Sequence, residues 1–153
     1  IDGETLEKKL ESGTPLPPQD IARWGMQIAA GLAAAHSKGM IHRDVKPANV
    51  LIEKETNRVK LTDFGLAQAS ADVKLTKTGM VTGTPLYMSP EQATGTGADE
   101  RSDLFSLGAV MYEMATGKSP FQAPSIVGVM KRVMDEVPDS PQKLNGSIPK
   151  TLS

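Results

Sequence analysis

Three polar side chains with complementary chemistry, Asp44, Lys46 and Asn49, lie within one short stretch of the chain. Pro47 stands among them, and a proline fixes its own backbone and disfavours a helical conformation in the preceding residue. The stretch therefore predicts a bent loop that directs its side chains at one point. This set suits phosphoryl transfer, because Asp44 can accept a hydrogen bond from an attacking hydroxyl, Lys46 can place positive charge on the moving group, and Asn49 can offer an oxygen to Mg²⁺.

A second oxygen ligand for the metal is available downstream at Asp63. Residues 50–52 and 59–62 are two short strand candidates, separated by a polar turn over residues 53–58. A hairpin built from them holds Asn49 at one end and Asp63 at the other, so that residues 14 apart in sequence can reach one ion. Mg²⁺ keeps several waters and binds substrate phosphates, so two protein ligands suffice.

Four motifs carry a resemblance to a known family. Residues 42–49 read His-Arg-Asp-Val-Lys-Pro-Ala-Asn, residues 63–65 Asp-Phe-Gly, residues 83–91 Gly-Thr-Pro-Leu-Tyr-Met-Ser-Pro-Glu, and residues 101–103 Arg-Ser-Asp. In this order and spacing, across nearly the whole chain, the sequence resembles the bacterial members of the eukaryotic-type (Hanks-type) Ser/Thr protein kinases. The resemblance implies transfer of the γ-phosphoryl group of ATP, with Mg²⁺, to Ser or Thr hydroxyls of a protein substrate.

The resemblance assigns a role to each residue that matches a motif. Asp44 and Lys46 are the expected catalytic residues, and Lys46, two positions after Asp44, favours Ser/Thr over Tyr acceptors. Asn49 and Asp63 are the expected metal ligands. The expected ATP-binding positions are Lys46, Ala48, Asn49, Leu51 and Asp63. For Leu51, the floor of an adenine pocket and an ordinary strand residue fit the periodicity equally well.

Residues 63–91 match the family's activation segment, and their length and polar composition are typical of a functional loop. Thr76 and Thr78 occupy positions where the bacterial kinases carry regulatory phosphothreonines. Arg43, directly before Asp44, could pair with such a phosphate. The alternative is that this threonine-rich loop is merely polar.

Other motif residues are expected to support the site. Asp103 begins a predicted helix and would be costly to bury alone. By resemblance, it accepts hydrogen bonds from the backbone of the His-Arg-Asp turn, while His42 and Phe64 pack against each other. The supporting set is completed by Gly65, Thr84 and Glu91.

The elements around the motifs predict a mainly helical α+β fold. The resemblance implies that this fold is the C-terminal lobe of a protein-kinase-like domain, with the short hairpin carrying the catalytic and metal loops. A long buried helix is expected from the Pro17-Pro18 start signal towards Gly39. His36, near its end, is expected to be a packed or capping residue, with metal ligation as the less favoured alternative. The other expected elements are helices at about 4–12, 100–116 and 124–135 and a loop over 138–153.

We interpret residues 1–153 as part of a kinase catalytic domain, from the end of the hinge through the helix after the activation segment, with both ends truncated and the small lobe absent. No complete Gly-x-Gly-x-x-Gly motif occurs in the 153 residues. We therefore expect little or no catalysis by these residues alone. In the intact parent protein, we expect the missing N-terminal lobe of the same chain to be their partner in catalysis.

Composition limits the other possibilities. With 17 basic against 18 acidic residues, the charge gives no support to nucleic-acid binding, and the absence of cysteine excludes disulfides and thiolate metal sites. No run of 18 apolar residues occurs, so the sequence predicts no membrane segment. We expect a cytoplasmic location, which leaves membrane anchoring of a parent protein open.

Two other functional classes compete with an active kinase. A pseudokinase-like scaffold or interaction module often lacks Asp44, Lys46 or Asp63, and all three are present. A small-molecule phosphotransferase shares a His-x-Asp and a later Asp, but it generally lacks a segment ending in Pro-Glu, as at residues 90–91. A glycine-rich loop and a strand lysine upstream would favour the enzyme over the scaffold.

Overall fold

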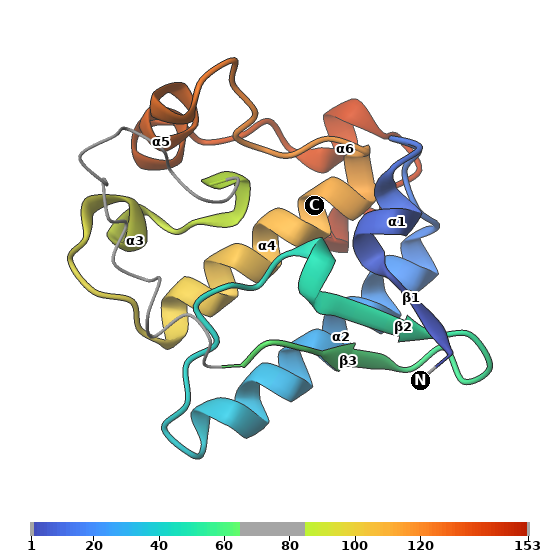
Figure 1. Cartoon of the computed structure of the whole chain (residues 1–153). Coiled ribbons are helices and arrows are strands. Elements are labelled where there is room, and N and C mark those ends of the chain that lie inside the picture. Colours follow the sequence, from blue (N-terminus) through green and yellow to red (C-terminus); the bar gives the residue numbers. More distant parts are fainter. Residues whose placement is uncertain (1, 65–84, 153) are drawn as a thin grey trace.

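The structure, a computed structural model, describes residues 2–64 and 85–152. Helices dominate this part of the chain, and a single antiparallel sheet of three strands lies beside them (Figure 1). The predicted α+β class with a predominance of helix is therefore confirmed. Within these residues, no helix combines the length and apolar character needed to cross a bilayer.

Two long helices form the centre of the fold. α2 (Pro18–His36) has proline at its first position, where the missing N–H costs nothing. α4 (Glu100–Thr116) begins at a capping box made by Asp99 and Ser102 and ends at Gly117 in the left-handed conformation. Both helices were predicted, although α2 ends at His36 and not near Gly39, and they pack against each other.

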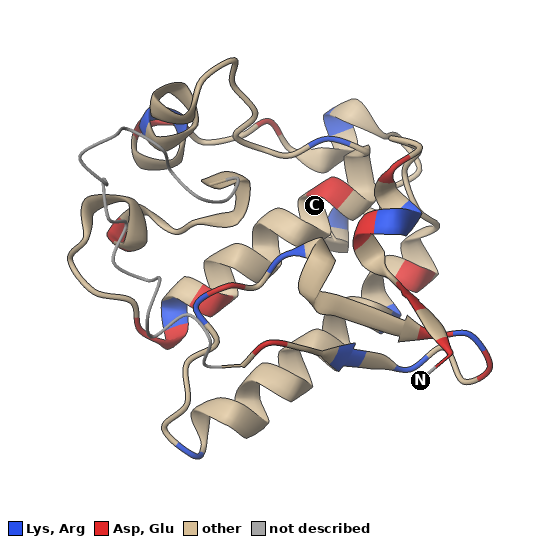
Figure 2. Cartoon of the chain, in the orientation of Figure 1, with Lys and Arg blue, Asp and Glu red and all other residues tan. Residues whose placement is uncertain are grey.

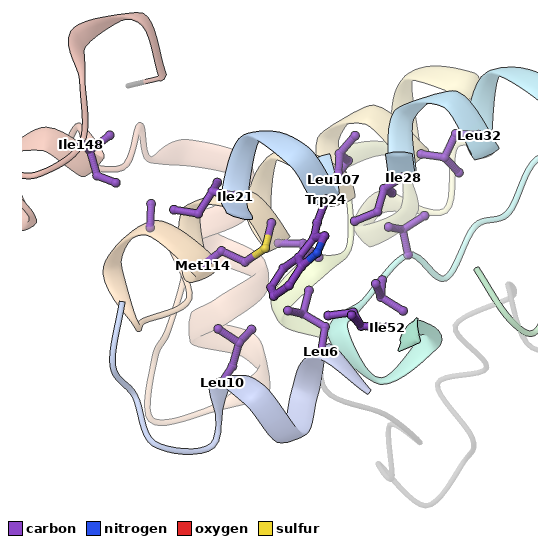
Figure 3. Close-up of a cluster of buried hydrophobic side chains, with 14 residues drawn as sticks. Leu6, Leu10, Ile21, Trp24, Ile28, Leu32, Ile52, Leu107, Met114 and Ile148 are labelled. Carbon is purple, nitrogen blue, oxygen red and sulfur yellow. The ribbon is translucent and has the colours of Figure 1, made fainter. Parts of the chain in front are cut away.

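The main core lies where the two helices meet the chain's N-terminal part (Figure 3). Apolar side chains recur on α2 at three- and four-residue spacing, which places them on one helix face. Met114 of α4 lies among them and is fully buried. The buried residues labelled in the figure are Leu6, Leu10, Ile21, Trp24, Ile28, Leu32, Ile52, Leu107, Met114 and Ile148.

The sheet has the strand order β1 (Gly3–Thr5), β2 (Val50–Glu53), β3 (Val59–Leu61), with both pairs antiparallel. The predicted hairpin is β2 and β3, paired so that Val50 faces Leu61. Strand β1 was not predicted, because three residues are too few to show a period of two.

The first helix is shorter than expected. Instead of spanning residues 4–12, α1 (Leu6–Leu10) begins only after Thr5, whose hydroxyl accepts a hydrogen bond from the N–H of Lys8 at 3.3 Å. Threonine is a good N-cap residue, and a cap has a non-helical backbone. Thr5 thus ends β1 and starts α1.

The C-terminal half contains several short elements. The 3₁₀ turn η3 (Pro85–Tyr87) and α3 (Pro90–Thr94) precede α4. The expected loop over residues 138–153 is a wrong prediction, because it contains α6 (Pro141–Leu144) and the 3₁₀ turn η4 (Lys150–Leu152).

A buried contact explains why this tail is ordered. Ile148 is 1% exposed and joins the main core. The Asn145 amide donates a hydrogen bond to the carbonyl oxygen of Ala115 at 2.8 Å, which fastens the tail to the end of α4.

The amphipathic helix α5 (Ile126–Asp135) buries Val129 and Val133, whereas Val127 is 75% exposed. Apolar residues occur on more than one side of α5. The side that carries Val129 is buried because it packs against η3 and α3. In α4, Leu104 is 55% exposed.

Charged residues are interspersed along the described elements (Figure 2). Most of the ion pairs among the described residues join positions close in sequence, as between Lys143 and Asp139 at 2.8 Å. Such exposed pairs contribute little to stability. The fold therefore depends chiefly on its apolar core and on a few buried polar contacts.

The close approach of the backbone at Gly117 to the backbone at Gly13 leads to a testable prediction about stability. Gly117 has φ of 72°, and a Cβ there would lie 2.0 Å from the carbonyl oxygen of Gly13. Gly95 has nearly the same φ, 70°, with no atom within 4 Å of its would-be Cβ. We expect Gly95→Ala to lower the free energy of unfolding by about 1 kcal/mol, and Gly117→Ala by roughly 1 to 3 kcal/mol more.

Urea unfolding of the two variants beside the wild type measures this difference. Equal losses of unfolding free energy in the two variants would contradict the predicted clash with Gly13, because the left-handed backbone would then account for the whole effect.

Candidate functional site

The loop that carries the predicted catalytic residues is anchored by alternate side chains. Val45 and Pro47 are buried, while Asp44 and Lys46 are partly exposed. The loop ends in the 3₁₀ turn η1 (Pro47–Asn49), which is closed by a hydrogen bond from the N–H of Asn49 to the carbonyl oxygen of Lys46 at 3.0 Å. The extended backbone before proline and the tight turn after it thus present Asp44 and Lys46 outward.

The structure brings three of the predicted residues together. Lys46 Nζ lies 2.8 Å from Asp44 Oδ2, and Asn49 Nδ2 donates to the same oxygen at 3.0 Å and to the Asp44 carbonyl at 2.8 Å. One carboxylate oxygen of Asp44 is therefore held by two donors. Its other oxygen, Oδ1, receives no hydrogen bond from the described residues, which leaves it able to accept one from a hydroxyl.

Asp63 is joined to this group through the hairpin. The N–H of Thr62 donates to the carbonyl oxygen of Asn49 at 3.0 Å, directly beyond the pairing of Val50 with Leu61. Asp63 follows at once, with φ of 62° and an exposed side chain. A left-handed backbone is uncommon outside glycine, and such residues cluster at functional sites. Asn49 directly precedes the first strand of the hairpin and Asp63 closely follows the second, so both residues lie at the open end of the hairpin, where they can reach one ion.

His42 links the two segments. It is fully buried, and its ring lies 4.5 Å from the ring of Phe64, centroid to centroid. Its Nε2 lies 2.9 Å from the carbonyl oxygen of Thr62, and its Nδ1 accepts the N–H of Asp44 at 3.3 Å. Because the carbonyl can only accept, Nε2 carries the proton and Nδ1 does not. The expected packing of His42 on Phe64 is present, and it is accompanied by hydrogen bonds that the sequence could not reveal.

Asp103 holds the loop from the α4 side. Its side chain is 0% exposed, and it accepts the N–H of His42 at 2.9 Å and the N–H of Arg43 at 2.7 Å. The Oδ2 atom also lies 2.7 Å from His36 Nε2. The hydrogen bonds expected for Asp103 are therefore present, and His36 is a packed partner of this carboxylate. Arg43 has φ of 65°, so Asp103 stabilises a residue in a strained conformation.

Glu91 joins α3 to α4. Its carboxylate accepts a hydrogen bond from the Ser102 hydroxyl. Partial burial opposes ionisation, but this bond and one to its own backbone N–H act against that, so the pKa of Glu91 lies below its usual value. The contact agrees with a supporting position for Glu91.

The remaining predicted positions are placed as follows. Leu51 lies on the sheet face opposite Val50 and Ile52, which point into the core. Ala48 is half-buried in η1. Outside the described residues lie Gly65, Thr76, Thr78 and Thr84.

A hollow adjoins Asp44, and the sequence analysis did not identify two of the residues that line it. Tyr87 and Gln92 line it beside Arg43 and Lys46. The Tyr87 hydroxyl donates to Glu113 Oε2 at 2.5 Å, and burial raises the pKa of both groups. Only the Ser-x-x-Gln spacing that ends at Gln92 was a visible signal, and it indicates a helix cap.

The donor set fits a magnesium-bound nucleotide. In residues 2–64 and 85–152, no group of three or more histidine and acidic side chains could hold a metal alone. Mg²⁺ does not require one, because it binds through one or two protein oxygens and substrate phosphates. Asn49 donates through Nδ2, and its Oδ1 accepts no hydrogen bond from these residues, so that oxygen and the Asp63 carboxylate are available as ligands.

The hydrogen bonds that Asp103 accepts from the catalytic loop lead to a testable prediction. Asp103→Asn removes the charge and turns an N–H₂ group towards backbone donors, so the free energy of unfolding should fall by roughly 3 kcal/mol. The exposed Asp139→Asn is a matched control and should leave the unfolding midpoint nearly unchanged. Chemical denaturation measures the unfolding midpoints of both variants, and equal midpoints would contradict the stabilising role of Asp103.

Comparisons with known proteins agree with this geometry. A family model described as the protein kinase domain matches residues 1–153. The chain is 41% identical to the Ser/Thr-protein kinase PknL of Mycobacterium tuberculosis, over 98% of this chain and 38% of PknL. It is 44% identical to the Ser/Thr-protein kinase PknB of Mycobacterium leprae, over 97% of this chain and 24% of PknB.

It is also 38% identical to the Ser/Thr-protein kinase PrkC of Bacillus subtilis, over 99% of this chain and 23% of PrkC. The chain thus spans from about a quarter to two-fifths of the length of these relatives. The bacterial kinase resemblance seen in the motifs is confirmed, and the chain belongs to the protein kinase domain family.

Proposed function

We propose that the chain is the larger lobe of a Ser/Thr protein kinase, which transfers the γ-phosphoryl group of ATP to hydroxyls of a protein substrate. The observation that carries the proposal is the grouping of Asp44, Lys46 and Asn49, with Asp63 at the same end of the hairpin. The names of the bacterial relatives support the same reaction class.

The residues divide the work of the reaction. Asp44, held at Oδ2 by Lys46 and Asn49, uses its other oxygen to orient the acceptor hydroxyl and take its proton. Lys46 stabilises charge on the phosphoryl oxygens. Asn49 and Asp63 would hold Mg²⁺, which neutralises phosphate charge when bound. Because the transition state is loose, positioning and charge neutralisation dominate over covalent chemistry.

A phosphoryl-transfer assay with protein and peptide acceptors tests the proposal in the intact kinase. Asp44→Asn should lower kcat by about 10²- to 10⁴-fold, the usual contribution of a general base, with little change in the KM for ATP. Asp135→Asn, at an exposed position at the end of α5, is the matched control and should leave kcat unchanged.

An Asp44→Asn variant with wild-type kcat would refute the assigned role, and transfer to small molecules alone would refute the substrate class. The intact kinase is needed because residues 1–153 supply no glycine-rich loop, and we propose that they do not turn over ATP alone. A parallel reaction at typical kinase rates with only these residues would overturn that part.

Regulation by the activation segment is part of the proposal. We propose that phosphorylation of Thr76 or Thr78 orders the segment by pairing with Arg43. The buried Nε atom of Arg43 has no hydrogen-bond partner among the described residues, which supports an acceptor from elsewhere. Such a pair forms charge-assisted hydrogen bonds.

Changing Thr76 and Thr78 together to alanine in the intact kinase should lower its phosphate content, and its activity by about tenfold or more. Thr151→Ala, at an exposed position, is the control. Mass spectrometry and the transfer assay provide the readouts, and unchanged phosphate content and activity would contradict the pairing.

A further inference from the structure

Gln92 connects α3 to the catalytic loop through its side-chain amide. Its Nε2 donates to the carbonyl oxygen of Arg43 at 2.8 Å, a contact between residues 49 apart in sequence. Its Oε1 accepts the N–H of Ser89 at 3.1 Å, which completes the capping box of α3. The backbone partners fix the orientation of the amide, because a carbonyl can only accept and an N–H can only donate.

The carbonyl that Gln92 holds belongs to the peptide unit between Arg43 and Asp44. The N–H of the same unit donates to His42 Nδ1 at 3.3 Å. The peptide plane that precedes the proposed base is therefore fastened at both of its polar atoms. This plane sets the direction in which the Asp44 side chain leaves the backbone.

The need for such fastening comes from Arg43. Its φ of 65° is left-handed, and this conformation persists in a non-glycine residue only where the surroundings impose it. Asp103 binds the N–H of Arg43 at 2.7 Å, and Gln92 binds its carbonyl. Both polar backbone groups of the strained residue are thus held, one from α4 and the other from α3.

We infer that Gln92 is a positioning residue for Asp44, which couples the end of the activation segment to the orientation of the proposed base. The inference rests on the proposed kinase function. Helix capping requires only Oε1, so it does not account for Nε2. When α3 is in place, Gln92 holds the Arg43–Asp44 peptide in the orientation that presents Asp44; when α3 shifts, that restraint is lost.

The substitution Gln92→Glu separates the two uses of the side chain. Glutamate keeps an acceptor for Ser89, since Ser-x-x-Glu is itself a capping box, and a negative charge is favourable in the first turn of a helix. It cannot donate to the Arg43 carbonyl. The variant should therefore keep the α3 cap while losing the restraint on the loop, and Gln27→Glu should match its small cost in the unfolding midpoint.

Gln27→Glu is a matched control. Gln27 Nε2 donates to the carbonyl oxygen of Asn57 at 3.5 Å, and Oε1 accepts the N–H of Val59 at 3.0 Å. Asn57 also has a left-handed backbone, with φ of 56°. The same chemical change is thus made at an equivalent bridge at the far end of the hairpin, away from Asp44.

The experiment compares both variants with the wild-type intact kinase by steady-state transfer assay, thermal unfolding and amide hydrogen exchange. We expect Gln92→Glu to lower kcat about tenfold, to leave the KM for ATP unchanged, to shift the unfolding midpoint no more than Gln27→Glu does, and to speed exchange in residues 41–46. Gln27→Glu should leave kcat and exchange in residues 41–46 unchanged.

Wild-type kcat and exchange in Gln92→Glu would overturn the inference, and so would a loss of kcat that Gln27→Glu reproduces. The exchange readout distinguishes this result from a failure of the proposed function. If the wild type transfers no phosphate, the proposed function fails, and faster exchange in residues 41–46 of Gln92→Glu alone still supports the coupling of α3 to the loop.

Discussion

The burial of the Asp103 carboxylate is the constraint on which the site depends. An ionised carboxylate without water requires donors, and the nearest ones are the backbone N–H groups of His42 and Arg43 and the ring of His36. Satisfying it draws the catalytic loop onto α4 and imposes a left-handed backbone on Arg43. The central helix pair therefore sets the backbone from which Asp44 projects, so that stability and geometry are linked at one residue.

His42 extends this order to the hairpin. Its ring is held by the Thr62 carbonyl on one side and by the N–H of Asp44 on the other, and it packs against the Phe64 ring at an interplanar angle of 57°. The segment of the proposed base and the segment of the proposed metal ligand Asp63 thus share one support, the His42 side chain. In a reaction that depends on positioning, such shared supports matter as much as the reacting groups.

Sequence reasoning succeeded where local rules and motif spacing act together. The start of α2 followed from its proline signal and apolar periodicity, although its end lies three residues before the predicted one. The bounds of α4 were predicted, and the hairpin register placed Asn49 and Asp63 together. The start of α1 was predicted too early, because Thr5 both ends a strand and caps a helix. The burial of Ile148 and of Val129 depends on the element each one meets, which no local pattern records. The contact between Gln92 and Arg43 was invisible for the same reason, since it joins residues distant in sequence.

The most direct test of the central claim is to locate a divalent ion in the intact kinase. Crystals grown with Mn²⁺ and a non-hydrolysable ATP analogue would reveal the ion through its anomalous scattering. If Asn49 and Asp63 serve one nucleotide-bound metal, the peak will contact the Asn49 side-chain oxygen and the Asp63 carboxylate together, beside Asp44. A peak bound elsewhere, or side chains of Asn49 and Asp63 that face different cavities, would contradict the claim.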